Sequence, residues 1–352
     1  MSDFVRVSRP SELVAMVPYL LGFHPSLSMV LIMLKPEATS VLATIRFDLP
    51  DDTCRWRVQE LTDLITRNAV THVVLVGYGP GARVTPSMDA VLTVLSEQGT
   101  EVVDALRVEE GRYWSYLCPD PGCCPPEGAP VDTCERVTAA AVVAGLVALP
   151  DRTAVAARLA PVEGEKREAM RDATLAAHEK ATSLLASTTS IGAYWYAEGR
   201  ARIKEALELA DREEDLSDEQ AAWLGILLTI IVVRDSVLTF TDFSDQTHLR
   251  LWCEVARRVE QAYVPAPATL AGLMALATGD GTVASVAVER ALSVDPCYSF
   301  AVLLRQGLKA GIRPDVIDRL RTPPLAQHIA AVVTQNPDVI RPILRDITSE
   351  GR

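Results

Sequence analysis

The chain has 352 residues, 49% hydrophobic and 23% charged, a balance typical of a globular protein with a sizeable core. Its net charge of −12 disfavours nonspecific binding to nucleic acid, which needs a surplus of lysine and arginine on one face. The apolar run 139–149 is too short to span a bilayer, and the first ten residues lack the apolar core of a secretion signal. Seven cysteines, an odd number, favour reduced thiols, so we expect a cytoplasmic protein without membrane contact.

Residues 1–150 predict an α/β domain. Pro10 begins a helix that should kink or end at Pro18, and two apolar strands at 27–34 and 40–47 should pair antiparallel. Next come a helix at 51–68, a strand at 72–78, a helix at 85–98 and strands at 101–108 and 112–117. Alternation of strand and helix calls for right-handed crossovers between parallel strands. We therefore expect a mixed, mainly parallel sheet of about five strands, flanked by helices.

Several polar residues should share the carboxyl edge of this sheet, where open α/β sheets usually bind ligands. Asp48 and Tyr78 end strands there, the turn at Glu109 follows another strand, and His24 precedes the first one. His24 is a candidate acid or base with Asp48 as its partner. The alternative is a packed, hydrogen-bonded histidine.

A glycine-rich turn follows the strand 72–78. Gly77, Gly79 and Gly81 lie between a buried strand and a helix, where backbone amides can face the phosphate of a nucleotide. Pro80 removes one of the amide donors, and the third glycine of a full dinucleotide fingerprint would lie deeper in the helix. A flexible strand-to-helix turn is the alternative interpretation.

Residues 118–130 form a loop that contains five prolines, and each proline restricts its own backbone and that of the residue before it. Cys118, Cys123 and Cys124, with Cys134 further on, supply thiolates of the kind that zinc binds. Their spacing differs from paired Cys-x-x-Cys knuckles, and adjacent cysteines do not easily ligate one tetrahedral ion. Three interpretations stay open: a metal site, a reversible disulfide from Cys118 to Cys123 or Cys124, and structural thiols. Redox chemistry would need a lowered thiol pKa, and the sequence shows no lysine or histidine beside the cysteines.

From residue 133 onward the pattern predicts helices, at 133–149, 151–160, 163–185, 194–210, 217–240 and 246–263. Ser217 and Gln220 match a capping box. We expect a helical region at 151–264 and a third region at 265–352. In the third region, small residues around the turn 279–281 are spaced as in a tetratricopeptide unit, with an ordinary helical hairpin as the alternative.

Three stretches resemble the DUF4192 family, namely SELVAMVPYLLGFHPSLSMVLIML at 11–34, VVDALRVEEGRYWSYLCPDPGCCPPEGAPVD at 102–132 and GLMALATGDGTVASVAVERALSVDP at 272–296. This family is known chiefly from actinobacteria and is named for having no established function. The resemblance therefore implies no catalytic residue, cofactor or substrate.

Two functional hypotheses follow. The first is a noncatalytic binding or scaffold protein that meets a protein partner or a second copy of itself, because the sequence contains no complete catalytic constellation beside its extensive helical surface. The second is an enzyme that uses a thiol or metal site at Cys118–Cys124, or a nucleotide at the Gly77–Gly81 turn.

Overall fold

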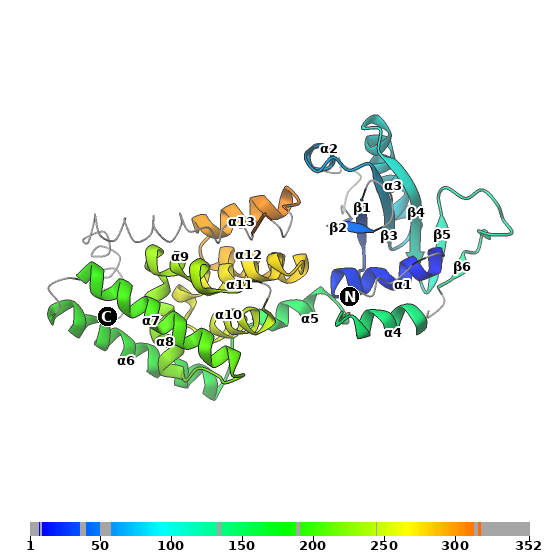
Figure 1. The fold of residues 1–352 in the computed structure, drawn as a ribbon. Helices are drawn as coiled ribbons and strands as arrows, with labels where there is room; N and C mark the ends of the chain where they lie inside the picture. Colours follow the sequence, from blue (N-terminus) through cyan, green and yellow to red (C-terminus); the bar gives the residue numbers. More distant parts are fainter. Residues whose placement is uncertain are drawn as a thin grey trace. The chain divides into compact units, whose positions relative to one another are not determined.

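The computed structural model describes residues 7, 9–35, 40–49, 58–131, 135–187, 191–243, 245–312 and 316–317. The described residues form two compact units, one running up to Val155 and including Gly307–Ile312, the other covering Ala156–Gln306 (Figure 1). An α/β unit followed by a helical region is thus confirmed. The finer division at residue 265 stays a prediction, and residues 318–352 lie outside the described residues.

Six strands form one sheet in the order β2-β1-β3-β4-β5-β6. They are β1 (Ser28–Leu34), β2 (Val41–Asp48), β3 (His72–Tyr78), β4 (Glu101–Glu109), β5 (Arg112–Ser115) and β6 (Ala129–Pro130). Of the five strand pairs in the described sheet, β3–β4 alone is parallel. The expectation of a mainly parallel sheet is wrong, because β1 lies between β2 and β3 and is antiparallel to both. The predicted antiparallel pairing of the first two strands is confirmed.

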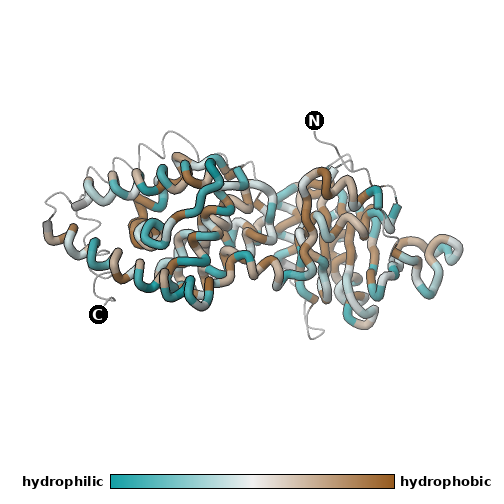
Figure 2. Tube along the Cα trace, turned by 90° about the horizontal axis from the view of Figure 1, so that it is seen from below, coloured by the Kyte–Doolittle hydropathy of each residue, from teal (hydrophilic) through white to brown (hydrophobic). Residues whose placement is uncertain are grey.

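Helices α2 (Val58–Arg67) and α3 (Gly81–Glu97) share one hydrophobic core with the sheet. Alternate residues of β1, including Met29 and Leu31, are at most 1% exposed and pack in this core with Met88 of α3. The intervening residues of β1 are also buried, as a continuous apolar run predicts for a strand covered on both faces. Figure 2 shows hydrophobic residues concentrated along the strands.

Helix α1 (Pro10–Leu21) packs against α4 (Glu135–Val143) and contacts β2 and β4. It does not end at Pro18 but continues to Gly22, whose φ of 79° terminates it in the left-handed conformation that favours glycine. The helix predicted at 133–149 is shorter than expected. It stops before Gly145, which also has a φ of 79° and forms a turn instead of a further helical residue.

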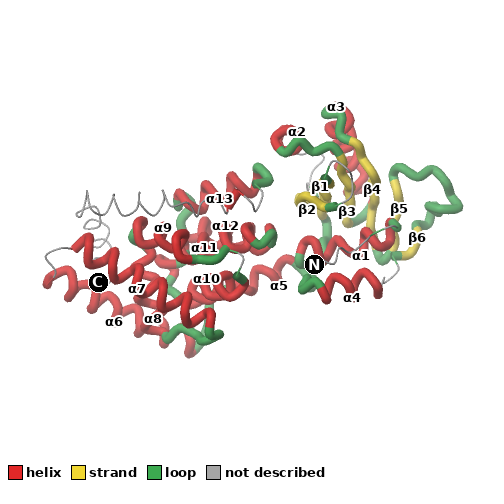
Figure 3. Tube along the Cα trace, in the orientation of Figure 1, coloured by secondary structure: helices red, strands yellow, loops and turns green. Residues whose placement is uncertain are grey.

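The described residues of the second unit form helices joined by loops and turns, with no strand among them (Figure 3). Its elements begin near α5 (Arg152–Ala156) and continue with α6 (Glu165–Ser187), α7 (Ile191–Asp211), α8 (Asp218–Leu228), α9 (Ile231–Phe240), α10 (Gln246–Arg258), α11 (Pro265–Ala277), α12 (Gly281–Val294) and α13 (Ser299–Lys309). Single 3-10 turns at Ala157–Leu159 and Gln261–Tyr263 follow α5 and α10, so the helices predicted at 151–160 and 246–263 are each divided near their ends.

The single helix predicted at 217–240 is two helices, α8 and α9, bent by 110°. The break falls at Ile230, whose backbone is extended, and the hydroxyl of Thr229 donates to the carbonyl of Ile226 at 2.7 Å. A threonine bond to its own preceding turn competes with regular helix geometry. The predicted capping box at the start of α8 is confirmed, with both reciprocal bonds between Ser217 and Gln220.

Within the described residues, no one helix has the length and apolar composition needed to cross a membrane. The bent pair α8 and α9 meets that criterion only when its two helices are taken together. Residues 221–228 of α8 are buried inside the unit.

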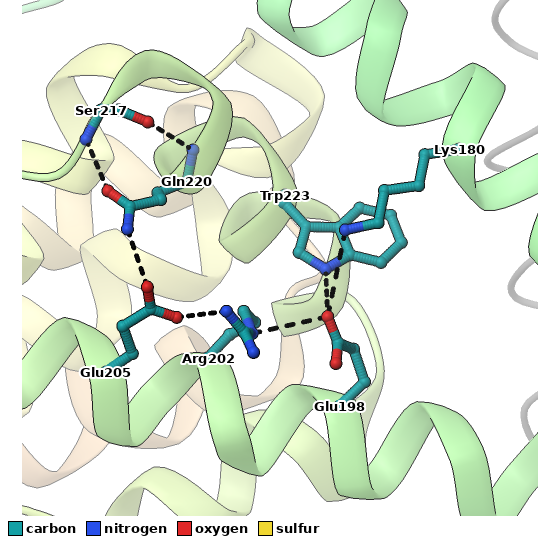
Figure 4. Close-up of polar contacts among 7 residues, drawn as sticks. All are labelled: Lys180, Glu198, Arg202, Glu205, Ser217, Gln220 and Trp223. Atoms are coloured by element: carbon teal, nitrogen blue, oxygen red, sulfur yellow. Dashed lines mark hydrogen bonds and ion pairs between the residues drawn. The ribbon is translucent and has the colours of Figure 1, made fainter.

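A polar network joins α6, α7 and α8 (Figure 4). It runs through Lys180, Glu198, Arg202, Glu205, Ser217, Gln220 and Trp223. Its central bond is from the Trp223 indole Nε1 to Glu198 Oε1, at 3.0 Å. The ammonium of Lys180 lies 4.0 Å from the Trp223 ring centroid, a cation–π contact on the same indole.

Helices α11 and α12 form the predicted hairpin. Its turn contains Gly279, with a φ of 83°, and Asp280, whose carboxylate caps α12 by accepting the Val283 N–H at 2.9 Å. The two helices approach closely, since a Cβ on Gly272 would lie 3.3 Å from the Ala284 carbonyl oxygen. Gly272 therefore lets the two helices pack closely, and the tetratricopeptide-like character of the hairpin stays a prediction.

Candidate metal centre

The loop that carries the cysteines begins after β5 and is anchored by Trp114. The indole of Trp114 lies beneath the guanidinium of Arg107, on the neighbouring strand, and its Nε1 donates to the Pro126 carbonyl at 3.0 Å. Gly128 packs against the same ring with a φ of 83°. One aromatic side chain thus joins the sheet to the end of the loop.

The loop leaves the sheet at the edge opposite the carboxyl edge, but its end returns to the carboxyl edge. Pro130 of β6 pairs with Arg112, and the Val131 N–H donates to the Gly111 carbonyl at 2.8 Å. The sequence did not indicate β6, because two residues are too short to show a strand pattern.

Hydrogen bonds within the loop hold the backbone around the cysteines. The Ser115 hydroxyl accepts the Cys118 N–H at 3.1 Å. The Asp120 carbonyl accepts the N–H groups of Cys123 at 3.1 Å and Cys124 at 2.7 Å, and the Asp120 side chain accepts the Gly122 N–H at 2.8 Å. Asp120 therefore organises the turn between the first and the second cysteine, a role that its position between two prolines did not reveal.

The thiols of Cys118, Cys123 and Cys124 converge. Their three sulfur atoms all lie within 4.8 Å of one another, although two of the cysteines are adjacent in sequence. Cys123 is exposed and the other two are half-buried, so the cluster is reached from solvent. Cys134, the fourth residue that the sequence suggests, lies outside the described residues.

Cys118 and Cys124 differ in acidity. The backbone N–H of Asp120 and the neighbouring thiol of Cys124 hold the pKa of Cys118 below its ordinary value. Burial, together with the neighbouring thiols, raises the pKa of Cys124 to about 12. The sequence offered no lysine or histidine to acidify a thiol, and in the folded loop a backbone amide has this effect instead.

His24 and Asp48 share the predicted edge, because Ser28 pairs with both Asp48 and Tyr78. Asp48 forms an ion pair with Arg46, and His24 is exposed. No described contact joins the two side chains, so acid–base chemistry by this pair stays a prediction.

The glycine turn has a packing role at its first residue. A Cβ on Gly77 would lie 2.2 Å from Val84 Cγ1, so the glycine lets α3 approach β3. Gly81 begins α3 beside the guanidinium of Arg107, which is paired with Glu109. A nucleotide at this turn likewise stays a prediction.

Comparisons with known proteins place the chain in one family. Residues 10–315 match the model of a family described as a domain of unknown function, DUF4192. Searches of the curated proteins and of the solved structures gave no match. Since the matched region covers most of the 352 residues, the chain belongs to the DUF4192 family.

Proposed function

We propose that this chain is a noncatalytic binding protein whose loop at 118–130 is held in shape by a zinc ion on Cys118, Cys123 and Cys124. The observation that carries the proposal is the convergence of three sulfur atoms within 4.8 Å. Zinc–sulfur bonds of about 2.3 Å in a tetrahedral site require sulfur atoms about 3.8 Å apart. The thiols therefore need to close by no more than about 1 Å.

Zinc accounts for all three sulfurs, whereas a disulfide accounts for two. A disulfide needs a sulfur–sulfur bond of about 2.0 Å, and it would leave the third thiol of the cluster without a partner. We place the protein in a cytoplasm, as an actinobacterial family member, where thiols are kept reduced and structural disulfides are rare. A divalent cation also neutralises the repulsion between neighbouring thiolates.

The binding function is supported by surface that the fold leaves open. Val142, Val143 and Val147, in and after α4, are 60%, 80% and 64% exposed. Exposed apolar side chains grouped in this way are typical of protein contact sites. We propose that a protein partner binds the unit that contains α4.

We also propose that the close-packed α11–α12 hairpin is a tetratricopeptide-like element, because Gly272 lets its two helices approach closely.

Elemental analysis tests the metal site. Protein purified without chelator should contain roughly one equivalent of zinc. Cobalt exchange should then give thiolate-to-metal absorption bands that disappear in Cys118→Ser and Cys124→Ser. Cys297→Ser is the matched control, because Cys297 is exposed and lies outside the cluster. Less than about a tenth of an equivalent of metal, with every thiol free to titrate, would overturn the metal site.

The binding function has its own test. Native mass spectrometry and a pull-down with the full chain should detect a partner protein, and Val143→Asp should reduce its capture. Self-association would appear as a dimer that the same substitution weakens, and would replace the partner by a second copy. A protein that stays monomeric and captures nothing would overturn the binding function while leaving the metal site intact.

A further inference from the structure

A second cluster of metal-ligating side chains lies in the helical unit, far along the chain from the cysteines. Asp211 ends α7, Asp245 caps the start of α10, and His248 lies in the first turn of α10. One ligand atom from each residue lies within 4.8 Å of the other two. The sequence does not reveal this site, because Asp211 is 37 residues away from His248 and belongs to a charge run that resembles a solvated helix end.

Two oxygen atoms face the ring nitrogens of His248. Its Nδ1 lies 3.3 Å from the carbonyl oxygen of Asp242, and its Nε2 lies 3.1 Å from the carboxylate of Asp211. Both oxygens are acceptors, whereas a neutral imidazole has a single N–H to donate. The histidine is only 5% exposed, so water cannot readily resolve the conflict.

The arrangement of the ring matches that of a metal ligand. Histidines that bind metals commonly donate one ring N–H to a backbone carbonyl, which orients the ring and leaves the other nitrogen for the ion. Here the Asp242 carbonyl fixes Nδ1 as the donor, and Nε2 points at Asp211. Asp242 lies outside the three-residue cluster, so it is an independent indication of which nitrogen is free.

Asp245 supplies the third ligand from the same helical face. It lies three residues before His248, a spacing that brings side chains together on a helix. Its carboxylate is fixed by the Thr247 N–H at 2.8 Å and by the Thr247 hydroxyl at 2.7 Å. The ligand position is therefore held in place before any ion arrives.

We infer that Asp211, Asp245 and His248 form a second metal site, for a divalent transition ion such as zinc or manganese. One imidazole with two carboxylates suits such ions better than it suits calcium or magnesium, which prefer all-oxygen sites. The ion would join the end of α7 to the start of α10 and so stabilise the helical unit.

Titration calorimetry with Zn²⁺ tests the site in a full-length variant carrying Cys118→Ser, Cys123→Ser and Cys124→Ser, so that the loop cannot compete. We expect one further zinc per chain and a rise in Tm. His248→Ala should weaken binding by more than tenfold, and so should Asp245→Asn, which keeps an N-cap for α10. His72→Ala, which removes a histidine of the sheet, should leave the affinity unchanged.

Three outcomes would overturn the inference. One is the absence of saturable zinc binding in the triple serine variant. Another is zinc binding that survives His248→Ala and Asp245→Asn unchanged, which would identify an adventitious ion only. The last is an imidazole whose NMR signals show both nitrogens protonated at pH 7 with excess zinc present, which would make His248 a simple ion-pair partner of Asp211. Each result is independent of the cysteine loop, because that site is absent from the protein tested.

Discussion

The guanidinium of Arg107 lies 3.7 Å from the ring centroid of Trp114, directly across the β4–β5 pair. This stacked pair, together with the bond from Trp114 to Pro126, fixes the base of the cysteine loop to the sheet. A cation over an indole contributes roughly 0.5–1 kcal/mol when exposed and more when desolvated. The conformation of the cysteine loop is therefore restrained by these contacts with the sheet as well as by its prolines.

Gly128→Ala should destabilise the first unit and loosen the loop. Its φ of 83° is unfavourable for alanine, and the added Cβ would lie 2.6 Å from Trp114 Cε2. Gly111→Ala is the matched control, since Gly111 has a similar φ of 72° but no atom within 4 Å of the new Cβ. We expect Gly111→Ala to cost about 1 kcal/mol and Gly128→Ala at least about 2 kcal/mol by urea unfolding. Equal losses of unfolding free energy in the two variants would show that the Trp114 indole can move aside without destabilising the fold.

The thiols should react with iodoacetamide in a fixed order after metal has been removed by chelator. The pKa of Cys118 is lowered by the Asp120 amide and by Cys124, so this thiol should react at a lower pH than Cys124, whose pKa is raised to about 12. Burial raises the pKa of Cys253 to about 11, and this buried thiol should react only after unfolding. Peptide mass spectrometry from pH 5.5 to 9 gives the order. Faster labelling of Cys124 than of Cys118 at pH 6 would contradict the geometry of the loop.

Asp280 should make the helical unit less stable as pH rises above the acid range. Burial raises the pKa of its carboxyl above the ordinary value, so the folded state binds this proton more tightly than the unfolded state. The resulting stability is complete below about pH 3.9, the unfolded value, and is lost as pH rises through the folded pKa. Asp280→Asn keeps a cap for Val283 but does not titrate. Between pH 4 and 7, the free energy of unfolding of Asp280→Asn should therefore rise relative to that of the unmodified protein.

Asp280→Ala separates capping from charge. It removes the acceptor of the Val283 N–H and should cost about 1 kcal/mol at every pH, on top of the change in slope. Urea unfolding at five pH values measures both the pH-independent contribution of the cap and the pH-dependent contribution of the charge. If the asparagine variant instead becomes less stable relative to the unmodified protein as pH rises, the fold favours the charged carboxylate.

The sequence predicted the elements of the α/β unit better than their order. Apolar runs identify β1 and β3 because both faces of these strands are buried, and that signal is local. Strand order depends instead on which strands β1 pairs with. The apolar runs of β1 and β3 do not show that β1 lies between β2 and β3 and is antiparallel to both. The breaks at Gly145 and Ile230 were missed for a related reason, since apolar periodicity continues past both residues while the backbone turns.

The candidate sites show the same division. The cysteines are visible in the sequence, but their convergence depends on a turn organised by the Asp120 carbonyl, which is a backbone group. Likewise, Asp211 and His248 meet only because α7 ends where α10 begins. The residue types of a site can be read from the sequence, whereas the contact between helices that are distant in the chain depends on tertiary packing.

Glu198 should stabilise the helical unit through one hydrogen bond more than through its ion pairs. Its partners Lys180 and Arg202 are 51% and 39% exposed, and ion pairs of that kind contribute little. The Trp223 ring is 4% exposed, so its Nε1–H needs the Glu198 oxygen as an acceptor. Glu198→Ala should therefore cost about 1–3 kcal/mol in the free energy of unfolding, and Glu198→Gln, which keeps an acceptor, less than about 1 kcal/mol.

A double-mutant cycle isolates this bond. Trp223→Phe alone removes the donor and also leaves a small cavity, but the cavity term cancels when Glu198→Ala is measured in both backgrounds. If the bond dominates, Glu198→Ala should cost at least about 1 kcal/mol less in the Trp223→Phe background than in the unmodified protein. If the two costs are equal, and Glu198→Gln is as damaging as Glu198→Ala, then the negative charge opposite Lys180 and Arg202 holds α6, α7 and α8 together instead.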